Sequence, residues 1–330
     1  MIARYAIPFF FLMGLVVVPL LLAALCRWLA PKRRWRRYAL IAALVVWALV
    51  LYGHFVGFQQ LEVHRYDYAS TDLPKAFDGY RIVHFSDAHV GSLTGWHQSF
   101  LQRAVDSINA LQPDLIVFTG DVQNLHPDEL RQQLPILKQL RAKDGVFSIL
   151  GNHDYPTYLD CSESEKASLV QQTKDLERQC GWRLLLNEYA VISRDSDSIV
   201  IAGMENWGKV KRMPRIGDVK KTLSTPSTPS TLHPSPSTFI VMLQHDPSCW
   251  REKILPECHA QLTLSGHTHG GQFSLLGWSP VAITTPEWGG WYTEGERSLY
   301  VSTGLAGLIP FRLNEPGEIA VITLRKKSLK

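Results

Sequence analysis

The first 60 residues of this 330-residue chain contain no aspartate or glutamate, although they contain seven lysines and arginines. The whole chain has 34 basic and 30 acidic residues, so the 270 residues that follow keep 27 basic against 30 acidic ones and are net −3. A protein that reads nucleic acid normally carries its basic charge on the recognition domain. The charge balance therefore argues against DNA or RNA as a partner.

Charge of either sign is missing from two long apolar runs near the N-terminus. Tyr5–Cys26 has 22 residues and Tyr38–Leu61 has 24, and each can cross roughly 30 Å of hydrocarbon as a helix. The sequence predicts a two-helix transmembrane hairpin in residues 1–61, with spans at about 5–26 and 38–58. A cleaved signal peptide is the alternative for the first run, which is longer than the roughly 7 to 15 apolar residues typical of such peptides.

The loop between the two runs, residues 27–37, is short and strongly basic. The positive-inside rule places such a loop in the cytoplasm. The N-terminus and everything after Leu61 are then expected on the extracytoplasmic side. The alternative is a solvated turn that has no influence on orientation.

Cysteine is scarce, with five residues in the chain. Cys26 lies at the end of the first apolar run, and the other four are Cys161, Cys180, Cys249 and Cys258. An even number allows pairing in an oxidising compartment, with 161–180 and 249–258 as the local pairs. Four unpaired thiols that pack as small core residues are the alternative.

Residues 62–330 are numerous enough for one large domain. Short apolar runs alternate with amphipathic stretches, which predicts an α/β fold, and the second half is richer in strands than in helices. This distribution predicts two packed sheets flanked by helices. The predicted helices are 97–111, 127–141 and 162–179, and the predicted strands are 81–86, 114–119, 145–150, 183–186, 190–193, 198–202, 239–244, 261–265, 298–302 and 318–324.

One segment, residues 224–238, repeats Ser-Thr-Pro and has little apolar surface. This composition predicts an extended, mobile loop. Because the segment precedes His245 by few residues, it is either a lid or glycosylated arm near a site, or a tolerated surface insertion.

Five short polar motifs are spread over about 180 residues, and each stands where a predicted strand ends. They offer carboxylate, amide and imidazole donors and no thiolate, which suits Mn, Fe or Zn. We expect two metal ions bridged by one carboxylate, and attack on phosphorus by a metal-bound hydroxide. The motifs are Asp87-Ala88-His89, Gly120-Asp121, Gly151-Asn152-His153-Asp154, His245 and Gly266-His267-Thr268-His269.

The spacing inside two motifs suggests how the ligands are presented. Asp87 and His89 are two positions apart, so on an extended strand end their side chains point the same way. His267 and His269 have the same spacing, and the glycines around them allow the loop to turn between them.

The order of the five motifs resembles that of the calcineurin-like metallophosphoesterase superfamily. The similarity runs from about Leu73 to Leu324. The stretch Gly266–Gln272 and the ending from Ser302 to Arg312 resemble its bacterial membrane-anchored phosphodiesterase branch. The resemblance implies a four-layer α/β/β/α sandwich with the metals at the edge of the sheets.

The resemblance also implies a role for each motif residue. His153 would stabilise charge on the phosphoryl oxygens or protonate the leaving oxygen. Mn is the expected metal, with Fe or Zn as alternatives. The first of two divalent ions would be held by Asp87, His89, Asp121 and His269, and the second by Asp121, Asn152, His245 and His267, so that Asp121 bridges them.

Two positions, 124 and 89, bear on which branch the chain resembles, and a third, Arg312, has an open role. Phosphoprotein phosphatases have an Asp that orients the catalytic His where this chain has Asn124, so the orienting role is open and phosphoprotein substrates are disfavoured. Purple acid phosphatases have a metal-binding Tyr at that position and Gly in place of His89, which disfavours an Fe(III)-tyrosinate centre. Arg312 is either a phosphate contact or a structural residue.

The expected function is that of a membrane-anchored, two-metal phosphohydrolase that cleaves a phosphodiester or pyrophosphate. Anchoring favours a lipid-linked substrate, such as a UDP-diacylglucosamine-type precursor or another envelope phosphodiester. The alternatives are a phosphomonoesterase for a small extracytoplasmic substrate and a metal-binding envelope protein without turnover. The expected partners are the lipid bilayer and the phosphorylated substrate.

Overall fold

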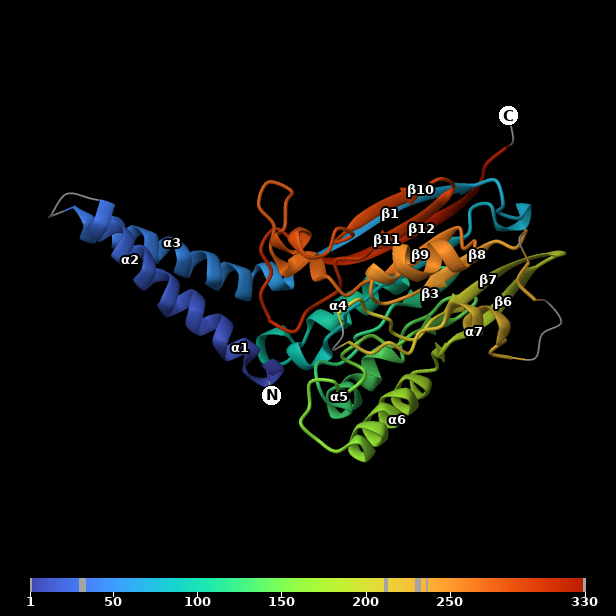
Figure 1. Cartoon of the computed structure of the whole chain (residues 1–330), viewed down its shortest axis with the longest axis horizontal. Coiled ribbons are helices and arrows are strands. Elements are labelled where there is room, and N and C mark those ends of the chain that lie inside the picture. Colours follow the sequence, from blue (N-terminus) through green and yellow to red (C-terminus); the bar gives the residue numbers. More distant parts are fainter. Residues whose placement is uncertain (1, 30–33, 211–212, 229–232, 236, 329–330) are drawn as a thin grey trace.

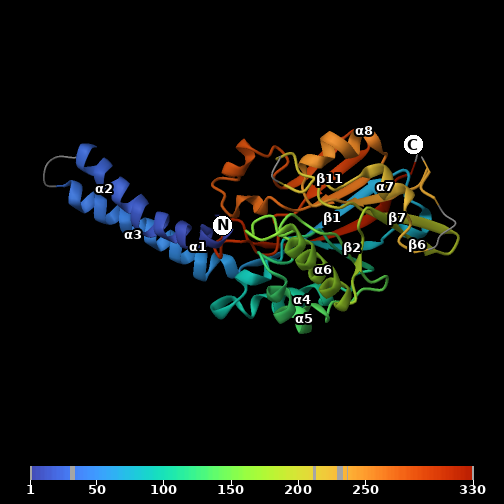
Figure 2. The ribbon, with the colours of Figure 1, turned by 60° about the horizontal axis from the view of Figure 1, so that its bottom comes forward.

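The computed structural model of the chain describes residues 2–29, 34–210, 213–228, 233–235 and 237–328. Figure 1 shows a long helical hairpin that projects from one end of a domain of sheets and helices. Figure 2 shows the same arrangement after rotation, with the C-terminal end of the chain on the side of the domain away from the hairpin.

The hairpin consists of two long apolar helices. The first comprises α1 (Ile2–Leu12), a π-helical turn (Met13–Val17) and α2 (Val18–Leu29), and the second is α3 (Trp35–Phe55). The stretches Ala6–Leu29 and Trp35–Gln59 are long and apolar enough to cross a membrane, and few of their residues are buried. They agree with the two predicted spans to within a few residues. The middle of the predicted basic loop, residues 30–33, lies outside the described residues.

The first sheet has the strand order β1-β12-β2-β3-β4-β5. Neighbouring strands are parallel except for the antiparallel pair β12–β2. The strands are β1 (Leu61–Ser70), β2 (Arg81–Phe85), β3 (Leu115–Phe118), β4 (Val146–Ser148), β5 (Arg183–Leu184) and β12 (Gly317–Lys326).

The second sheet has the strand order β10-β11-β9-β8-β7-β6. Its four central strands are parallel, and the edge strands β10 and β6 are antiparallel to their neighbours. The strands are β6 (Glu188–Arg194), β7 (Asp197–Gly203), β8 (Ile240–Leu243), β9 (Leu262–Ser265), β10 (Gly290–Glu294) and β11 (Arg297–Val301).

The inner faces of the two sheets form the central core. Ile82 and Leu115 of the first sheet pack in one buried cluster with Ile201, Val241 and Leu264 of the second. Because successive strand residues point to opposite faces, the outer face of each sheet also needs an apolar cover.

Helices supply that cover on both sides. α4 (Phe100–Ala110), α5 (Pro127–Leu137) and α6 (Glu163–Gln179) contribute to the cluster on the outer face of the first sheet. α7 (Val219–Ser224) and the buried Trp250, which precedes α8 (Leu255–Glu257), cover the second sheet. The four-layer α/β/β/α sandwich implied by the resemblance is therefore confirmed.

Four of the labelled helices and strands of the domain were not predicted, namely β1, β10, α7 and α8. The helix predicted at 97–111 begins at Phe100 after a 3-10 turn (Gly95–His97), and the helix predicted at 127–141 ends at Leu137. All five cysteines lie among the described residues and are unpaired thiols. Cys180 and Cys249 are buried, as expected for small core residues, whereas Cys161 and Cys258 are only partly buried.

The Ser/Thr/Pro-rich segment is packed in part, so the prediction of an extended mobile loop is wrong for residues 225–228. Tyr189 donates its N–H to the carbonyl of Thr225, and Ser227 donates its N–H to the carbonyl of Tyr189, which extends the second sheet beyond β6. Arg183 donates to the hydroxyls of Ser227 and Thr228. Residues 229–232 and 236 lie outside the described residues.

Candidate metal centre

The five motifs meet at one edge of the sandwich. Each follows the end of a strand: β2, β3 and β4 in the first sheet, and β8 and β9 in the second. Because neighbouring parallel strands end at the same sheet edge, loops far apart in the sequence are brought together there. The seven residues of the predicted metal set and His153 are therefore close in space, and most are buried.

A first group of ligand atoms comes from four residues. The donor atoms of Asp87, His89, Asp121 and His269 all lie within 4.8 Å of one another. His89 Nε2 is 3.6 Å from Asp121 Oδ2, and His269 Nε2 is 3.5 Å from Asp87 Oδ1. The two carboxylates and two imidazoles form a set that can hold one divalent ion.

A second group of ligand atoms surrounds His245 Nε2. This atom is 3.2 Å from Asp121 Oδ2, 3.1 Å from Asn152 Oδ1 and 3.2 Å from His267 Nδ1. Asp121 therefore directs the same oxygen, Oδ2, towards both groups. Its other oxygen, Oδ1, accepts the backbone N–H of His153 at 2.7 Å.

Two of the possible ligand atoms have no hydrogen-bond partner within the described part of the chain, as is expected of atoms that bind a metal ion. Among the described residues, Asp121 Oδ2 and His89 Nε2 are buried without a hydrogen bond. Burying a carboxylate oxygen without a partner is costly, and a cation would remove that cost. Asp121 Oδ2 belongs to both groups of ligand atoms and His89 Nε2 to the first, and the chemistry of these donors suits divalent metals.

In three of these histidines, Nδ1 lies within hydrogen-bond distance of an acceptor, while Nε2 faces the other ligand atoms. His245 Nδ1 donates to the carbonyl of Thr119 at 2.7 Å, and His269 Nδ1 donates to that of Ala306 at 3.3 Å. His89 Nδ1 lies 3.1 Å from Asn124 Oδ1. Such contacts fix the tautomer that leaves Nε2 free to bind a metal.

Asn124 has two orientations with opposite consequences for His89. With its oxygen towards His89, Asn124 accepts the Nδ1 proton and donates its amide to Ser92 Oγ. With the two ends of the amide exchanged, it donates to His89 Nδ1 and accepts from Ser92. A metal at His89 Nε2 requires the first orientation, because only then does Nε2 lack a proton.

The protonation of the cluster follows from its burial and charges. Burial lowers the pKa of His89 and of His269 to about 3, so both rings are neutral donors. Burial alone would also lower the pKa of His245, but the Asp121 carboxylate outweighs it and raises that pKa to about 10. The carboxylates thus attract a positive charge, which a metal ion supplies in place of the proton.

Several site residues have a left-handed backbone, unlike the extended strand end that we predicted. The φ angles are 52° at Asp87, 38° at His89, 60° at Asp121, 75° at His267 and 55° at His269. Non-glycine residues rarely adopt such angles, and their occurrence together marks stored strain at a functional site. Asp87 and His89 therefore converge because the chain turns beyond Phe85, where β2 ends.

Asp154 is a buried residue whose role the sequence did not reveal. Its carboxylate accepts the backbone N–H groups of Asp121 at 2.8 Å, Val122 at 3.0 Å and Gly151 at 2.8 Å. It thereby ties the loop after β3 to the loop after β4. Burial, together with the Asp121 charge, raises the pKa of Asp154 to about 7.

His153 is oriented by the backbone at position 124. Its Nδ1 donates to the carbonyl of Asn124 at 2.6 Å, so the side chain at that position is not needed for this purpose. The ring of Tyr158 stacks on His153 with centroids 4.5 Å apart, and Tyr158 Oη accepts the amide of Asn152 at 3.0 Å. Tyr158 thereby holds Asn152 with its oxygen towards His245.

Arg312 is a structural residue and not a phosphate contact. Its side chain is 1% exposed, and its guanidinium donates to backbone carbonyls at positions 303, 304, 306, 315 and 316. Among these is Ala306, whose carbonyl accepts His269 Nδ1 and whose N–H donates to the carbonyl of Asp87. Arg312 thus stabilises the loop that supports the first group of ligands.

Hollows flank the ligand groups on two sides. One of about 570 Å³ is lined by Tyr158, Leu125 and α6, and so borders the ring that stacks on His153. Another of about 430 Å³ borders His267 and is lined by Asp246, Arg251 and Ile283. A substrate whose scissile phosphorus lies at the ligand groups therefore has space for substituents on both sides.

Comparison with known proteins agrees with this geometry. Residues 80–271 match the family model described as calcineurin-like phosphoesterase. The chain is 32% identical over 285 residues to the metallophosphoesterase YkuE of Bacillus subtilis, a match that covers 83% of this chain and 89% of YkuE.

Two other relatives are linked to membranes or lipids by their names. A transmembrane protein with metallophosphoesterase domain from Danio rerio is 30% identical over 299 residues, which cover 88% of this chain and 63% of that longer protein. The UDP-2,3-diacylglucosamine pyrophosphatase LpxG of Chlamydia muridarum is 28% identical over 288 residues, covering 76% of this chain and 86% of LpxG.

Proposed function

Because this chain belongs to the calcineurin-like phosphoesterases, a family of metal-dependent hydrolases of phosphate esters, we propose that it cleaves a phosphodiester or pyrophosphate bond of a membrane lipid. The observation that carries the proposal is the pair of ligand groups that share Asp121 Oδ2. In this proposal Asp87, His89, Asp121 and His269 hold one ion, and Asp121, Asn152, His245 and His267 hold the other.

Two bound divalent ions would supply Lewis acidity to the phosphoryl oxygens and make water a nucleophile at neutral pH. The remaining work falls to the protein. Asp121 fixes the separation of the two ligand groups, and its Oδ1 holds the backbone of His153 in place. The contacts to Thr119, Ala306 and Asn124 keep three imidazoles in the tautomer that binds metal.

His153 is the proposed catalytic residue. Its ring lies 4.8 Å from that of His89, centroid to centroid, and is held through Nδ1, so Nε2 is the atom available to a substrate. Because Nδ1 already donates a proton to Asn124, Nε2 donates to a phosphoryl oxygen or to the leaving oxygen in the imidazolium form of the ring, which carries a proton on both nitrogens.

The lipid-linked substrate is supported by the two apolar helices and by the similarity to LpxG. We further propose that the domain faces the extracytoplasmic side, because six of the seven lysines and arginines in residues 1–61 lie in the loop between the two spans. That orientation favours an envelope phosphodiester over a nucleotide-linked precursor made in the cytoplasm.

The full chain in detergent, loaded with Mn, should hydrolyse bis-p-nitrophenyl phosphate and lose that activity when the metal is chelated. Readdition of Mn should restore it. Turnover that persists after chelation would contradict the proposed mechanism. The same preparation should then be given lipid-linked pyrophosphates, phosphodiesters and phosphomonoesters in mixed micelles. Faster hydrolysis of the monoesters would overturn the proposed substrate class while leaving the metal centre intact.

A further inference from the structure

A group of large apolar side chains is exposed at the end of the domain that carries the hairpin. Leu276 is 98% exposed, Ile283 is 76% exposed, and Leu275 and Trp278 are at least half exposed. Exposed apolar clusters of this kind mark contact sites. We propose that residues 273–286, here named the apolar loop, insert into the interfacial layer of the same bilayer that the hairpin spans.

The composition of the apolar loop suits contact with lipid. The sequence from Phe273 to Pro286 contains no charged residue, whereas the 270 residues that follow position 60 have 27 basic and 30 acidic ones. Transfer of Leu, Ile and Trp side chains out of water is favourable in proportion to the apolar area removed. No residue of the loop carries a charge that would have to be desolvated on insertion, and the charged residues near Ile283, such as Asp246 and Arg251, line the adjoining hollow.

The tip of the loop is a tight turn with paired backbone groups. Leu275 and Trp278 exchange two backbone hydrogen bonds, at 2.9 and 3.1 Å. Leu276 and Gly277 lie between them with φ of 52° and 77°. Because the polar groups at the base of this turn are paired within it, the apolar tip can enter a lipid layer without exposing an unpaired strand edge.

Hydrogen bonds place the apolar loop beside the inner end of the hairpin. Arg312 donates its N–H to the carbonyl of Gly53 in α3, and the neighbouring Leu313 donates to the carbonyl of Gln272. Ser274 then donates its N–H back to the carbonyl of Leu313. Figures 1 and 2 both show the orange segment that follows β9 at the end of the domain from which the hairpin projects.

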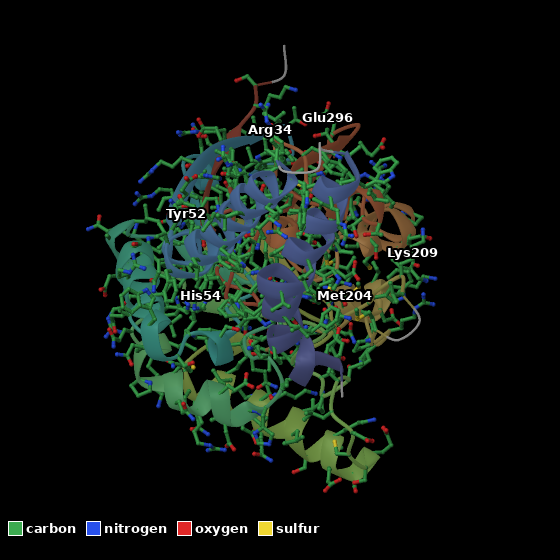
Figure 3. All side chains as sticks on the ribbon, turned by 90° about the vertical axis from the view of Figure 1, so that its left-hand side faces the viewer. Arg34, Tyr52, His54, Met204, Lys209 and Glu296 are labelled. Carbon is green, nitrogen blue, oxygen red and sulfur yellow. The ribbon has the colours of Figure 1, made fainter. Side chains whose placement is uncertain are left out.

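The inner end of the hairpin indicates where the membrane surface lies relative to the domain. Trp96 is 68% exposed and packs edge-on against Phe55 of α3, with ring centroids 5.7 Å apart. Tryptophan favours the interface between headgroups and hydrocarbon. Figure 3, seen from the hairpin side, shows Tyr52 and His54 at the inner end of α3, in front of the domain. The domain therefore meets the bilayer at the level of the apolar loop.

Lipid is favoured over a second copy of the chain as the occupant of this surface. Hydrogen bonds through residues 309–314 link the apolar loop to α3, a helix that is apolar enough to span the membrane. Any molecule that covered the loop would have to lie in the plane of the headgroups. The lipids that surround the hairpin already occupy that plane.

The proposal can be tested with a fluorescent probe on the full chain in lipid nanodiscs. A Leu276→Cys variant, made in a background with Cys26, Cys161 and Cys258 replaced by Ser, is labelled with an environment-sensitive dye. The matched control is Ser196→Cys, an exposed position in the turn between β6 and β7. A second probe, at Ile283→Cys, guards against a local effect of the substitution. Thermal unfolding of each labelled chain verifies the fold.

We expect the probes at 276 and 283 to emit further to the blue than the probe at 196. A phosphatidylcholine with a nitroxide near its headgroup should quench the first two strongly and leave the third unchanged. Solvent-like emission without quenching at 276 and 283 would overturn the proposal. Blue-shifted emission that lipid nitroxides fail to quench would also overturn it, in favour of a second copy of the chain. Neither readout depends on hydrolysis, so the result is independent of the proposed enzymatic function.

Discussion

The carboxylate of Asp121 serves two purposes at once. Its Oδ2 lies 3.6 Å from His89 Nε2 in one ligand group and 3.2 Å from His245 Nε2 in the other. Its Oδ1 accepts the backbone N–H of His153, the proposed catalytic residue. One side chain therefore links both groups of ligands to the group that acts on substrate.

Replacement of this carboxylate should disable the site as a whole. Asp121→Asn keeps the shape of the side chain but removes the charge that offsets two cations. We expect loss of bound metal and a fall in kcat of at least roughly 100-fold. This exceeds the usual effect of removing a residue that only hydrogen-bonds to a metal ligand. Metal content by mass spectrometry and turnover of bis-p-nitrophenyl phosphate measure the two effects. Asp128→Asn, at an exposed position in α5, is the control, and unchanged metal content in D121N would contradict the assignment.

Asn124 acts on His89 through its side chain and on His153 through its backbone. Asn124→Ala removes the acceptor for His89 Nδ1 but keeps the carbonyl that holds His153. Metal affinity should fall roughly 10- to 100-fold, while kcat at saturating metal changes little. Titration of the metal against a competing chelator measures the affinity. Asn124→Asp, which restores the acceptor, should restore metal affinity. Equal affinity in N124A and the native chain would show that the side chain does not position His89.

The convergence of the motif residues was predictable from sequence, whereas their geometry was not. Asp87 and His269 stand in short motifs whose residue types and order resemble those of a metallophosphoesterase, and the structure brings both into one group of possible ligands. The left-handed backbone at Asp87 and the contacts of Asp154 depend on loops that meet only in the folded protein. Tyr158 has no motif around it, and its contacts with His153 and Asn152 are seen only in the folded protein.

Among the helices and strands, β1 is one that the pattern of apolar residues did not predict. It lies at the edge of the first sheet, and its residues alternate between charged and partly buried positions, so it lacks the continuous apolar run of a central strand. Its partner β12 is almost fully buried and was predicted. A ten-residue parallel register with β12 fixes β1, and only the folded chain supplies that contact.

The pairing of β1 with β12 should make stability depend on pH. A hydrogen bond from His64 of β1 to Glu318 of β12 outweighs the effect of burial and raises the pKa of His64 to about 9. Since the pKa of an unfolded histidine is about 6.5, protonated His64 favours the folded state. This contribution is complete below about pH 6.5 and is lost as the pH rises through about 9.

The stabilising effect of protonated His64 can be tested by thermal unfolding of the full chain in detergent between about pH 6.5 and 9. The native chain should lose stability as the pH rises, and His64→Gln should flatten that part of the profile. His126→Gln, at an exposed position before α5, should leave the slope unchanged. An unaltered slope in H64Q would mean that another group is responsible.

At the scale of the whole molecule, the hairpin is packed against the domain as well as connected to it. Phe311 lies against Gly53, where an added Cβ would come within 2.2 Å of its ring, and Gly57 leaves similarly little room beside the carbonyl of Arg312. His54 Nδ1 donates to the carbonyl of Pro310 at 2.6 Å. The two glycines permit this close approach.

The orientation of the whole molecule can be tested with reporters at the C-terminus. Alkaline phosphatase fused after Lys330 should be active, and a green fluorescent protein in the same place should be dark, because the domain is proposed to be extracytoplasmic. Replacing the five basic residues between positions 32 and 37 by Gln should weaken this preference, since the positive-inside rule depends on them. The reverse pattern in the native chain would place the domain in the cytoplasm.

The hydrogen bond from Arg312 to Gly53 has a kinetic consequence. It joins the loop that supports Asp87 and His269 to a helix that remains in the bilayer, so the ligand groups stay at a fixed height above the lipid. A lipid substrate would then be found by diffusion in two dimensions. Its rate of hydrolysis would follow the mole fraction of substrate in the membrane and would not follow its bulk concentration, so added inert lipid would act as a diluent.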